Sequence, residues 1–206
     1  MGVMIVPSNK IILSEDDIAR CWEFSNKIIC SKNQYDRMMK NGLSDSDRLL
    51  YRIKRTFAGK AGEMAFYRFL EQNGKVPGNS DEMFEIYTGT TNVDSFDFRT
   101  SANKTVDIKT AVFANHKRLL VPLDQFNDIP KDYYVGIKLK LPDNVVDYGD
   151  SFTPQCIKDA YICGFTTHER LKSSENMNFG EYYCKAESLS DLSDISELIA
   201  MFDDIR

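Results

Sequence analysis

The spacing of apolar residues changes at Asn73-Gly74, and this change constrains the fold more than any other feature of the chain. Before it, apolar residues recur every three or four positions, as on one face of a helix. After it, short runs of aromatic and β-branched residues predict strands. The order of helices, then strands, then a short helical end predicts an α+β or mixed α/β protein. We expect a mixed central β-sheet flanked by helices.

The helical part carries start and stop signals. Ser14 is the expected N-cap of a first helix, with Asp17 in the capping-box position that Glu usually takes. The Asn-Gly pair is a typical helix stop. The other helical segments follow from the same spacing: residues 34–40, a helix capped by Asp45 or Ser46, and, after an interruption at Gly59 and Gly62, a helix up to Asn73.

The strand part consists of short runs separated by polar or glycine-containing turns. The segment Ser101-Ala-Asn-Lys104 is a suitable hairpin turn between two of these runs. The predicted strands cover residues 83–87, 95–99, 105–112, 119–121, 133–141, 160–165 and 181–185, and a closing helix is expected over residues 194–202.

The chain has 206 residues, which is enough for one sizeable domain or for a domain with a helical annex. Its 42% hydrophobic and 28% charged residues are typical of a globular protein and unlike a disordered one. No apolar run approaches the roughly 18–20 residues that cross a bilayer. Residues 1–13 lack the features of a signal peptide. We therefore expect a cytoplasmic protein with no membrane partner.

The cysteines give no sign of a metal or disulfide framework. There are five, an odd number, and no two are spaced as Cys-x-x-Cys. The chain also has no phosphate-binding Gly-Lys-Ser/Thr loop, so no nucleotide cofactor is expected.

One predicted hairpin brings two carboxylates and an ammonium together. If the turn is centred near residue 102, Asp97 and Asp107 face each other across an antiparallel pair, with Cβ atoms about 5 Å apart. Lys109 lies two residues beyond Asp107, and the period of a strand keeps it on the same side. Asp94 competes as the first acid but would lie on the opposite face. A slip of one residue in register would separate the group.

These side chains suit a hard divalent cation. Two facing carboxylates repel each other and lose water unless a cation lies between them. Mg²⁺, or Mn²⁺ in its place, takes oxygen ligands such as Asp97, Asp107 and the backbone carbonyl of Ile108. Glu63 heads an otherwise apolar helical face, so it would complete the metal shell directly or through water. Lys109 would orient an attacking water or neutralise a charged phosphorane.

The segment Gly59-Lys-Ala-Gly-Glu63, followed by Asp97 and by Val-Asp107-Ile-Lys109-Thr, resembles the PD-(D/E)XK nuclease superfamily. Two later segments, Asp132-Tyr-Tyr-Val-Gly136 and Tyr161-Ile-Cys-Gly164-Phe, are similar to the later core strands of such nucleases, so the likeness covers roughly residues 58 to 190. Phe96 stands where the signature has a proline, and no Gln-x-x-x-Tyr motif follows the lysine.

The resemblance implies a restriction-endonuclease-like core sheet, Mg²⁺-dependent phosphodiester hydrolysis and a DNA substrate. It makes Asp97 and Asp107 the metal-binding acids, Lys109 the catalytic lysine and Glu63 the helical acid. Residues 58–206 would form the nuclease core with its closing helix. Residues 1–57 would form an N-terminal helical region that contributes to DNA contact or specificity.

The net charge of −5 counts against a nucleic-acid partner, but the charges are unevenly distributed. Residues 27–60 hold nine Lys and Arg against three acids, whereas residues 141–206 hold five against thirteen. The field at a site matters more than the total charge. The candidate contacts to a DNA backbone are Arg48, Arg52, Lys54, Arg55, Lys60, Lys117 and Arg118.

Three hypotheses stay open at this point. The first is a Mg²⁺-dependent DNA endonuclease of restriction, repair, recombination or mobile-element or viral type, expected to act as a homodimer when it cuts both strands. The second is a non-catalytic nucleic-acid-binding or assembly protein that keeps the nuclease fold. The third is an unrelated interaction domain in which Glu63 serves the helix dipole and the hairpin matches by chance.

Overall fold

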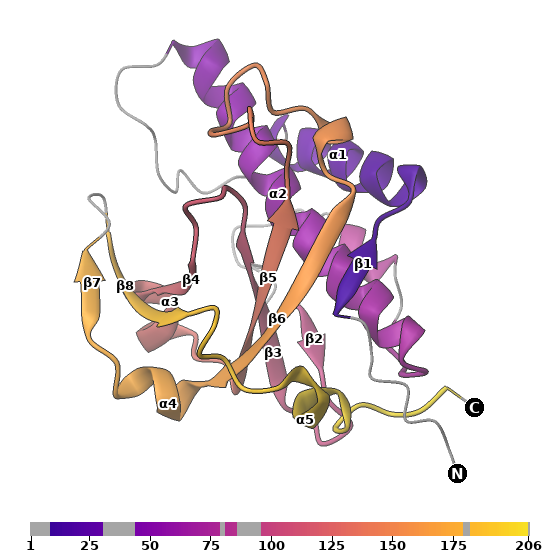
Figure 1. The fold of residues 1–206 in the computed structure, drawn as a ribbon, viewed down its shortest axis with the longest axis vertical. Helices are drawn as coiled ribbons and strands as arrows, with labels where there is room; N and C mark the ends of the chain where they lie inside the picture. The colour runs from indigo at the N-terminus through magenta and orange to yellow at the C-terminus, as the bar shows by residue number, and fades with distance from the viewer. Residues whose placement is uncertain (1–8, 31–43, 79–80, 86–95, 179–181, 206) are drawn as a thin grey trace.

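The computed structural model describes residues 9–30, 44–78, 81–85, 96–178 and 182–205. It has a mixed α+β fold with two sheets, which confirms the predicted class (Figure 1). The described elements are, in order, β1 (Lys10–Ile12), α1 (Glu15–Cys30), α2 (Asp45–Gln72), the 3₁₀ turn η1 (Glu82–Phe84), β2 (Phe98–Arg99), β3 (Thr105–Ala111), β4 (Arg118–Pro122), α3 (Leu123–Asp128), β5 (Tyr133–Lys140), the 3₁₀ turn η2 (Pro154–Cys156), β6 (Asp159–Thr167), α4 (His168–Lys172), β7 (Asn176–Asn178), β8 (Tyr183–Ser188) and α5 (Ile195–Ile199).

The central sheet has the strand order β1-β6-β5-β3-β2. Its strands pair antiparallel except for β3 and β5, which run parallel. A parallel pair needs a crossover connection, and β4 with α3 provides it. β4 therefore leaves the central sheet and joins β8 and β7 in a second, three-stranded sheet. The strands therefore do not all pair in their order along the chain.

Helix α1 begins as predicted. The Ser14 hydroxyl accepts a hydrogen bond from the Asp17 N–H at 3.1 Å, and the Ser14 N–H donates to Asp17 Oδ2 at 3.1 Å. This reciprocal pair satisfies two of the N–H groups that a helix start leaves without partners. Asp17 is buried and pairs with Arg68 of α2 at 2.7 Å, so the cap also fastens α1 to α2.

Helix α2 is one continuous helix, so the predicted interruption at its glycines is wrong. Its N-cap is Ser44, just before the predicted caps, and it ends at Asn73 as predicted, with Gly74 at φ +68°. A glycine inside a helix costs about 1 kcal/mol relative to alanine, which the tertiary packing of a buried helix can offset. The expected boundary between residues 57 and 58 lies within this helix, and elements on both sides of it share one core.

Several other predictions can be compared with the structure. The strands predicted around residues 105–112, 133–141 and 160–165 are confirmed as β3, β5 and β6. Residues 82–84 form a 3₁₀ turn where the strand over residues 83–87 was predicted to begin. The predicted helix over residues 34–40 lies outside the described residues.

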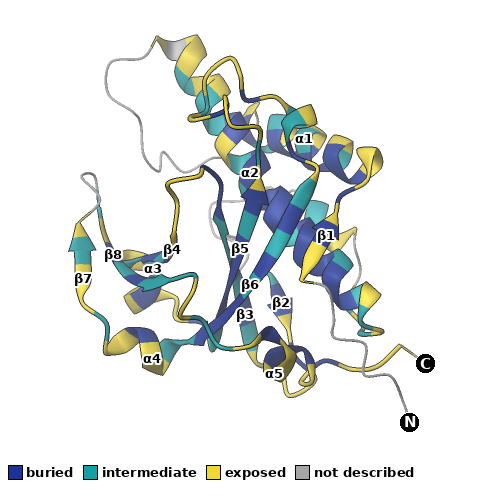
Figure 2. Cartoon of the chain, viewed as in Figure 1, coloured by how far each residue is buried: buried dark blue, intermediate teal, exposed yellow. Residues whose placement is uncertain are grey.

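Two apolar clusters hold the layers together, as the buried segments in Figure 2 show. The larger cluster lies between the central sheet and helices α1, α2 and α5, and includes Phe66 of α2 and Ile108 of β3. The smaller cluster lies between the two sheets and includes Tyr134 of β5 and Phe126 of α3. Side chains alternate along a strand. One face of β3 therefore carries Ile108 toward α2, and the other carries Asp107 and Lys109 toward α3.

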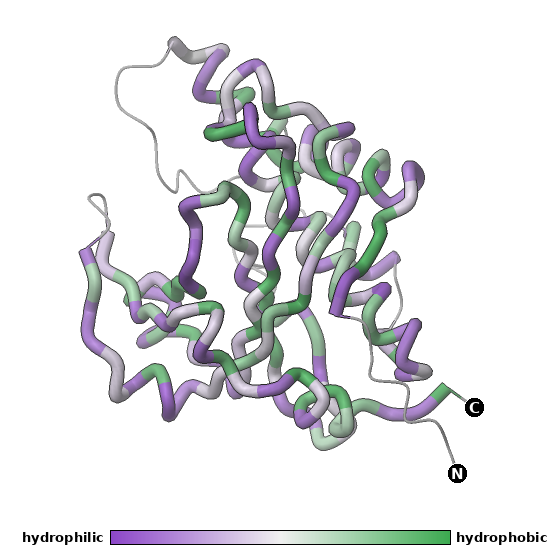
Figure 3. The backbone as a smooth tube through the Cα atoms, in the orientation of Figure 1, coloured by the Kyte–Doolittle hydropathy of each residue, from purple (hydrophilic) through white to green (hydrophobic). Residues whose placement is uncertain are grey.

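Hydrophilic and hydrophobic residues are mixed along the helices (Figure 3). Within the described ranges, no helix is both long enough and apolar enough to cross a membrane.

Candidate active site

The β2–β3 hairpin has the predicted register. Phe98 pairs with Val106 and Arg99 with Thr105, so the pairing is centred on residue 102. The pairing does not continue regularly beyond Phe98, because the Asp97 N–H donates at 3.0 Å to the carbonyl of Val106, which is already the partner of Phe98, and Asp97 lies in a bend before β2. The predicted register therefore holds at Phe98 and Arg99, whereas Asp97 and Asp107 are not among the paired residues of the hairpin.

Asp97 also bonds to β3 through its side chain, where Oδ2 accepts the Ile108 N–H at 2.6 Å. The N–H and C=O of one strand residue point to the same side of the strand. The Ile108 carbonyl, a predicted metal ligand, is therefore directed toward the same edge as Asp97. Asp94, the competing acid, lies outside the described residues.

Asp107 and Lys109 form an ion pair on the second face of β3, with 2.5 Å between Oδ2 and Nζ. Lys109 also donates to Gln125 Oε1 at 3.0 Å. Burial lowers the pKa of Lys109, but the Asp107 carboxylate raises it more, so the net pKa lies above the ordinary value. Lys109 is thus a protonated donor held by two oxygen atoms.

Glu63 reaches the same region from the middle of α2. Its Oε2 lies 2.5 Å from Lys60 Nζ, and Lys60 also donates to the Met83 carbonyl at 2.9 Å. Lys60 is buried, with its ammonium 4.7 Å from the centre of the Phe24 ring. The charge of Lys60 is directed inward onto Glu63, so its contact with a DNA backbone stays a prediction that this burial disfavours.

Asp97 is the electrostatic centre of the group. Burial raises the pKa of Asp97 well above its ordinary value, and the negative charges of Glu63 and Asp107 raise it further. The Ile108 hydrogen bond acts in the opposite direction but does not prevail. Of the three acids, Glu63 and Asp107 have an ammonium partner. The described part of the chain gives Asp97 no such ion pair. Asp97 is therefore the acid whose charged form this arrangement favours least.

The carboxylate and carbonyl oxygens near Asp97 are of the type that a hard cation binds, but they are not grouped as a ligand shell. Three carboxylates and a backbone carbonyl are the oxygen donors that Mg²⁺ prefers. Across the described ranges, however, no three His, Cys, Asp or Glu side chains are grouped closely enough to hold a metal ion. The ion pairs of Lys60 with Glu63 and of Lys109 with Asp107 occupy two of the acids in this arrangement.

Two residues near the site, Gln125 and Lys131, were not predicted from the sequence. Gln125 lies on α3, and its contact with Lys109 depends on β4 leaving the central sheet. Lys131 is buried and donates to the Ile129 carbonyl at 2.6 Å. Burial lowers the pKa of Lys131, and the charge of Asp107 partly opposes this change. Neither residue stands in a local motif, so the sequence carried no signal for them.

The other predicted DNA contacts divide into two groups. Lys54 is buried and donates to the Gly149 carbonyl at 2.6 Å, which disfavours its predicted contact with DNA. Arg55, Lys117 and Arg118 are exposed, and Arg48 and Arg52 are partly exposed. Burial, and then the charges of Lys138 and Arg55, lower the pKa of His116. Arg55 of α2 therefore lies near the loop that carries Lys117.

No protein-family model matches this chain, and no curated protein or solved structure matches it either. The functional assignment accordingly depends on the site described above.

Proposed function

We propose that the chain is a Mg²⁺-dependent DNA endonuclease of the PD-(D/E)XK type, with Glu63, Asp97, Asp107 and Lys109 at its active centre. The observation that supports it most is the position of Asp97. This acid accepts the Ile108 N–H of β3 and lies within the fields of Glu63 and Asp107, and it has no ion pair with an ammonium among the described residues. A bound divalent cation would favour the charged form of Asp97.

Each residue has a defined part in the proposed site. Asp97, Asp107, the Ile108 carbonyl and Glu63 would hold the ion. Mg²⁺, when bound, would stabilise negative charge on a scissile phosphate and lower the pKa of water. Lys109 is protonated, so it donates hydrogen bonds to the attacking water or to the phosphate oxygens rather than accepting a proton. Gln125 and Asp107 orient its ammonium from two sides.

Cleavage of supercoiled plasmid tests the proposal. We expect nicking in the presence of Mg²⁺ or Mn²⁺ and none with EDTA. Asp107→Asn and Lys109→Met should each lower the rate by about 100-fold or more, as the loss of one preorganised charged group does elsewhere. Lys104→Met is the matched control, because Lys104 lies in the same hairpin but is exposed. Equal rates for Lys109→Met and Lys104→Met would exclude the proposed site.

A second candidate is a non-catalytic nucleic-acid-binding or assembly protein with the same fold. The ion pairs that occupy Glu63 and Asp107 favour it, because an ion would have to compete with two ammonium groups. Binding of duplex, flapped, junction and single-stranded DNA without metal-dependent cutting would support this candidate. The expected homodimer stays a prediction, which analytical ultracentrifugation with and without DNA can check.

A further inference from the structure

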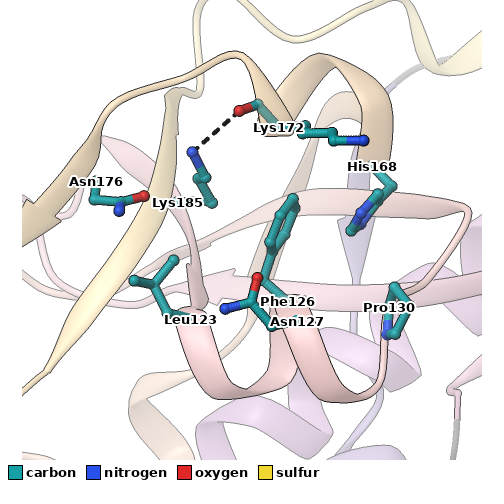
Figure 4. Close-up of a pocket in the computed structure, with 8 residues that line it drawn as sticks. All are labelled: Leu123, Phe126, Asn127, Pro130, His168, Lys172, Asn176 and Lys185. Atoms are coloured by element: carbon teal, nitrogen blue, oxygen red, sulfur yellow. Dashed lines mark hydrogen bonds between the residues drawn. The ribbon is translucent and has the colours of Figure 1, made fainter.

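A cavity of about 360 Å³ opens on the side of the second sheet, away from the proposed active centre. It is formed by α3, α4, β7 and β8 (Figure 4). Ligand pockets have volumes of about 300–1,000 Å³, so this cavity suits a single small molecule rather than a chain segment. Its lining residues are Leu123, Phe126, Asn127, Pro130, His168, Lys172, Asn176 and Lys185.

The cavity has an aromatic wall. The rings of Phe126 and His168 stack with centroids 4.1 Å apart and planes 13° apart. Phe126 is buried, so the partly exposed His168 is the member of the stack that a ligand can reach. His168 Nδ1 is buried and meets no hydrogen-bond partner in the described part of the chain. Because Nδ1 is out of reach of solvent, a ligand in the cavity would contact the exposed part of the His168 ring instead.

The cavity is also cationic. Lys172 and Lys185 contribute two ammonium groups, and none of the eight lining residues is acidic. The Lys185 ammonium donates to the carbonyls of Lys172 and Ser174, which hold it in place. An ammonium has three N–H donors, so Lys185 keeps one for an anion. Asn127 and Asn176 add side-chain amides, which can both donate and accept.

We propose that this cavity binds one nucleotide. The two ammonium groups suit its phosphate, the aromatic wall its base, and the two amides the hydrogen-bonding edge of the base. The cavity is distinct from the proposed active centre. Leu123 and Asn127 lie on the opposite side of α3 from Gln125, since residues two apart on a helix are about 200° apart. The proposal therefore does not depend on cleavage.

Titrations followed by ¹⁵N-resolved NMR, on the full chain without divalent metal, test the proposal. Deoxyadenosine monophosphate should shift the signals of α3, α4 and β8, and should bind about tenfold more tightly than deoxyadenosine or inorganic phosphate alone. A single-stranded tetranucleotide provides the second arm. Tighter binding of the tetranucleotide identifies a subsite for a DNA strand, and tighter binding of the mononucleotide identifies a site for free nucleotides.

Two variants test whether the mononucleotide binds in the cavity. Lys172→Glu and Asn127→Asp each add negative charge to its wall and should weaken binding of the mononucleotide about tenfold. Both residues are exposed, so the fold should tolerate the changes. Lys158→Glu and Asn144→Asp are matched exposed controls elsewhere and should leave binding unchanged. No signal change at about 10 mM mononucleotide, or equal binding by the variants and the unmodified chain, would overturn the proposal.

Discussion

The ammonium of Lys109 lies between the carboxylate of Asp107 and the amide oxygen of Gln125. The ion pair supplies most of the electrostatic stabilisation, and the amide fixes the direction of the remaining donors. A side chain with several rotatable bonds needs both contacts if its charge is to be positioned before a substrate arrives. The contact with Gln125 can be removed without touching any of the acids.

Gln125→Met should slow the proposed cleavage by about tenfold, because a hydrogen bond to a charged group contributes roughly 1.5–3 kcal/mol. Gln125→Glu keeps an acceptor at the same place and should recover much of the rate. Plasmid nicking assays measure both variants. If Gln125→Glu is as slow as Gln125→Met, the side chain does not act by holding Lys109.

The buried ion pair of Asp17 and Arg68 makes stability depend on pH. Burial raises the pKa of Asp17, but the hydrogen bonds from Arg68 and Ser14 outweigh this effect and leave the pKa below its ordinary value of 3.8. The folded state therefore binds the proton less well than the unfolded state. The resulting stability is present above the ordinary pKa and is lost as pH falls through the lowered one.

Asp17→Asn should lower the free energy of unfolding by about 2 kcal/mol at pH 7, since Arg68 keeps only Glu71 as its partner. The difference from the unmodified chain should shrink below about pH 4, where Asp17 begins to be protonated in the unfolded chain. Urea unfolding at pH 7 and pH 3 measures both values. Glu71→Gln is the control on the exposed side of Arg68. If Glu71→Gln lowered the free energy of unfolding as much as Asp17→Asn does, the burial of Asp17 would not explain the loss.

At the scale of elements, the close packing of α2 against β3 determines how near Glu63 comes to the hairpin. A Cβ atom on Gly62 would overlap Thr110 Oγ1 and lie 3.1 Å from Thr110 Cβ. A Cβ atom on Gly59, one turn earlier, would meet nothing within 4 Å. The two glycines look alike in sequence, yet only Gly62 allows the close contact that brings Glu63 toward the hairpin.

Gly59→Ala should therefore raise the free energy of unfolding by about 1 kcal/mol, the usual gain in helix propensity. Gly62→Ala should lower it by about 1–3 kcal/mol, as overpacking does in other cores. The double variant Gly62→Ala, Thr110→Ala should recover part of this loss. Thermal unfolding distinguishes the three. A Gly62→Ala variant as stable as Gly59→Ala would show that α2 can move away without cost.

At the scale of the whole molecule, the positive charges divide into an internal and an external set. Lys54 and Lys60 point inward onto a carbonyl and a carboxylate, whereas Arg55, Lys117 and Arg118 face the solvent. Only exposed charges release counterions when a phosphate backbone binds. A count of charges along the sequence therefore overestimates how many Lys and Arg side chains are exposed and could contact DNA.

Lys117→Ala and Arg118→Ala should each weaken DNA binding at all sequences and reduce the salt slope of log K by about 1. Lys54→Met should leave binding unchanged but lower the free energy of unfolding by about 2 kcal/mol, because the Gly149 carbonyl loses its charged donor. Fluorescence anisotropy at several salt concentrations and urea unfolding separate these effects. Lys158→Ala serves as an exposed control. A salt slope that is unchanged by Lys117→Ala and Arg118→Ala would place the DNA elsewhere.

Features that depend on neighbours along the chain were predictable from the sequence. The Ser14–Asp17 cap, the stop at Asn73 and the pairing of Phe98 with Val106 in the hairpin each follow from a few adjacent residues. Their geometry is determined by local hydrogen bonding and by the period of the element, which a sequence displays directly.

Contacts between distant segments were decided by the tertiary structure alone. Gln125 reaches Lys109 from α3, which follows β4 of the second sheet, and Lys54 donates to Gly149, which is 95 residues away along the chain. Such pairings depend on which surfaces pack together, and periodicity cannot show this. The sequence by itself determined the hairpin that carries Asp107 and Lys109. The tertiary structure decided that Lys60 pairs with Glu63 and left Asp97 without an ion pair among the described residues.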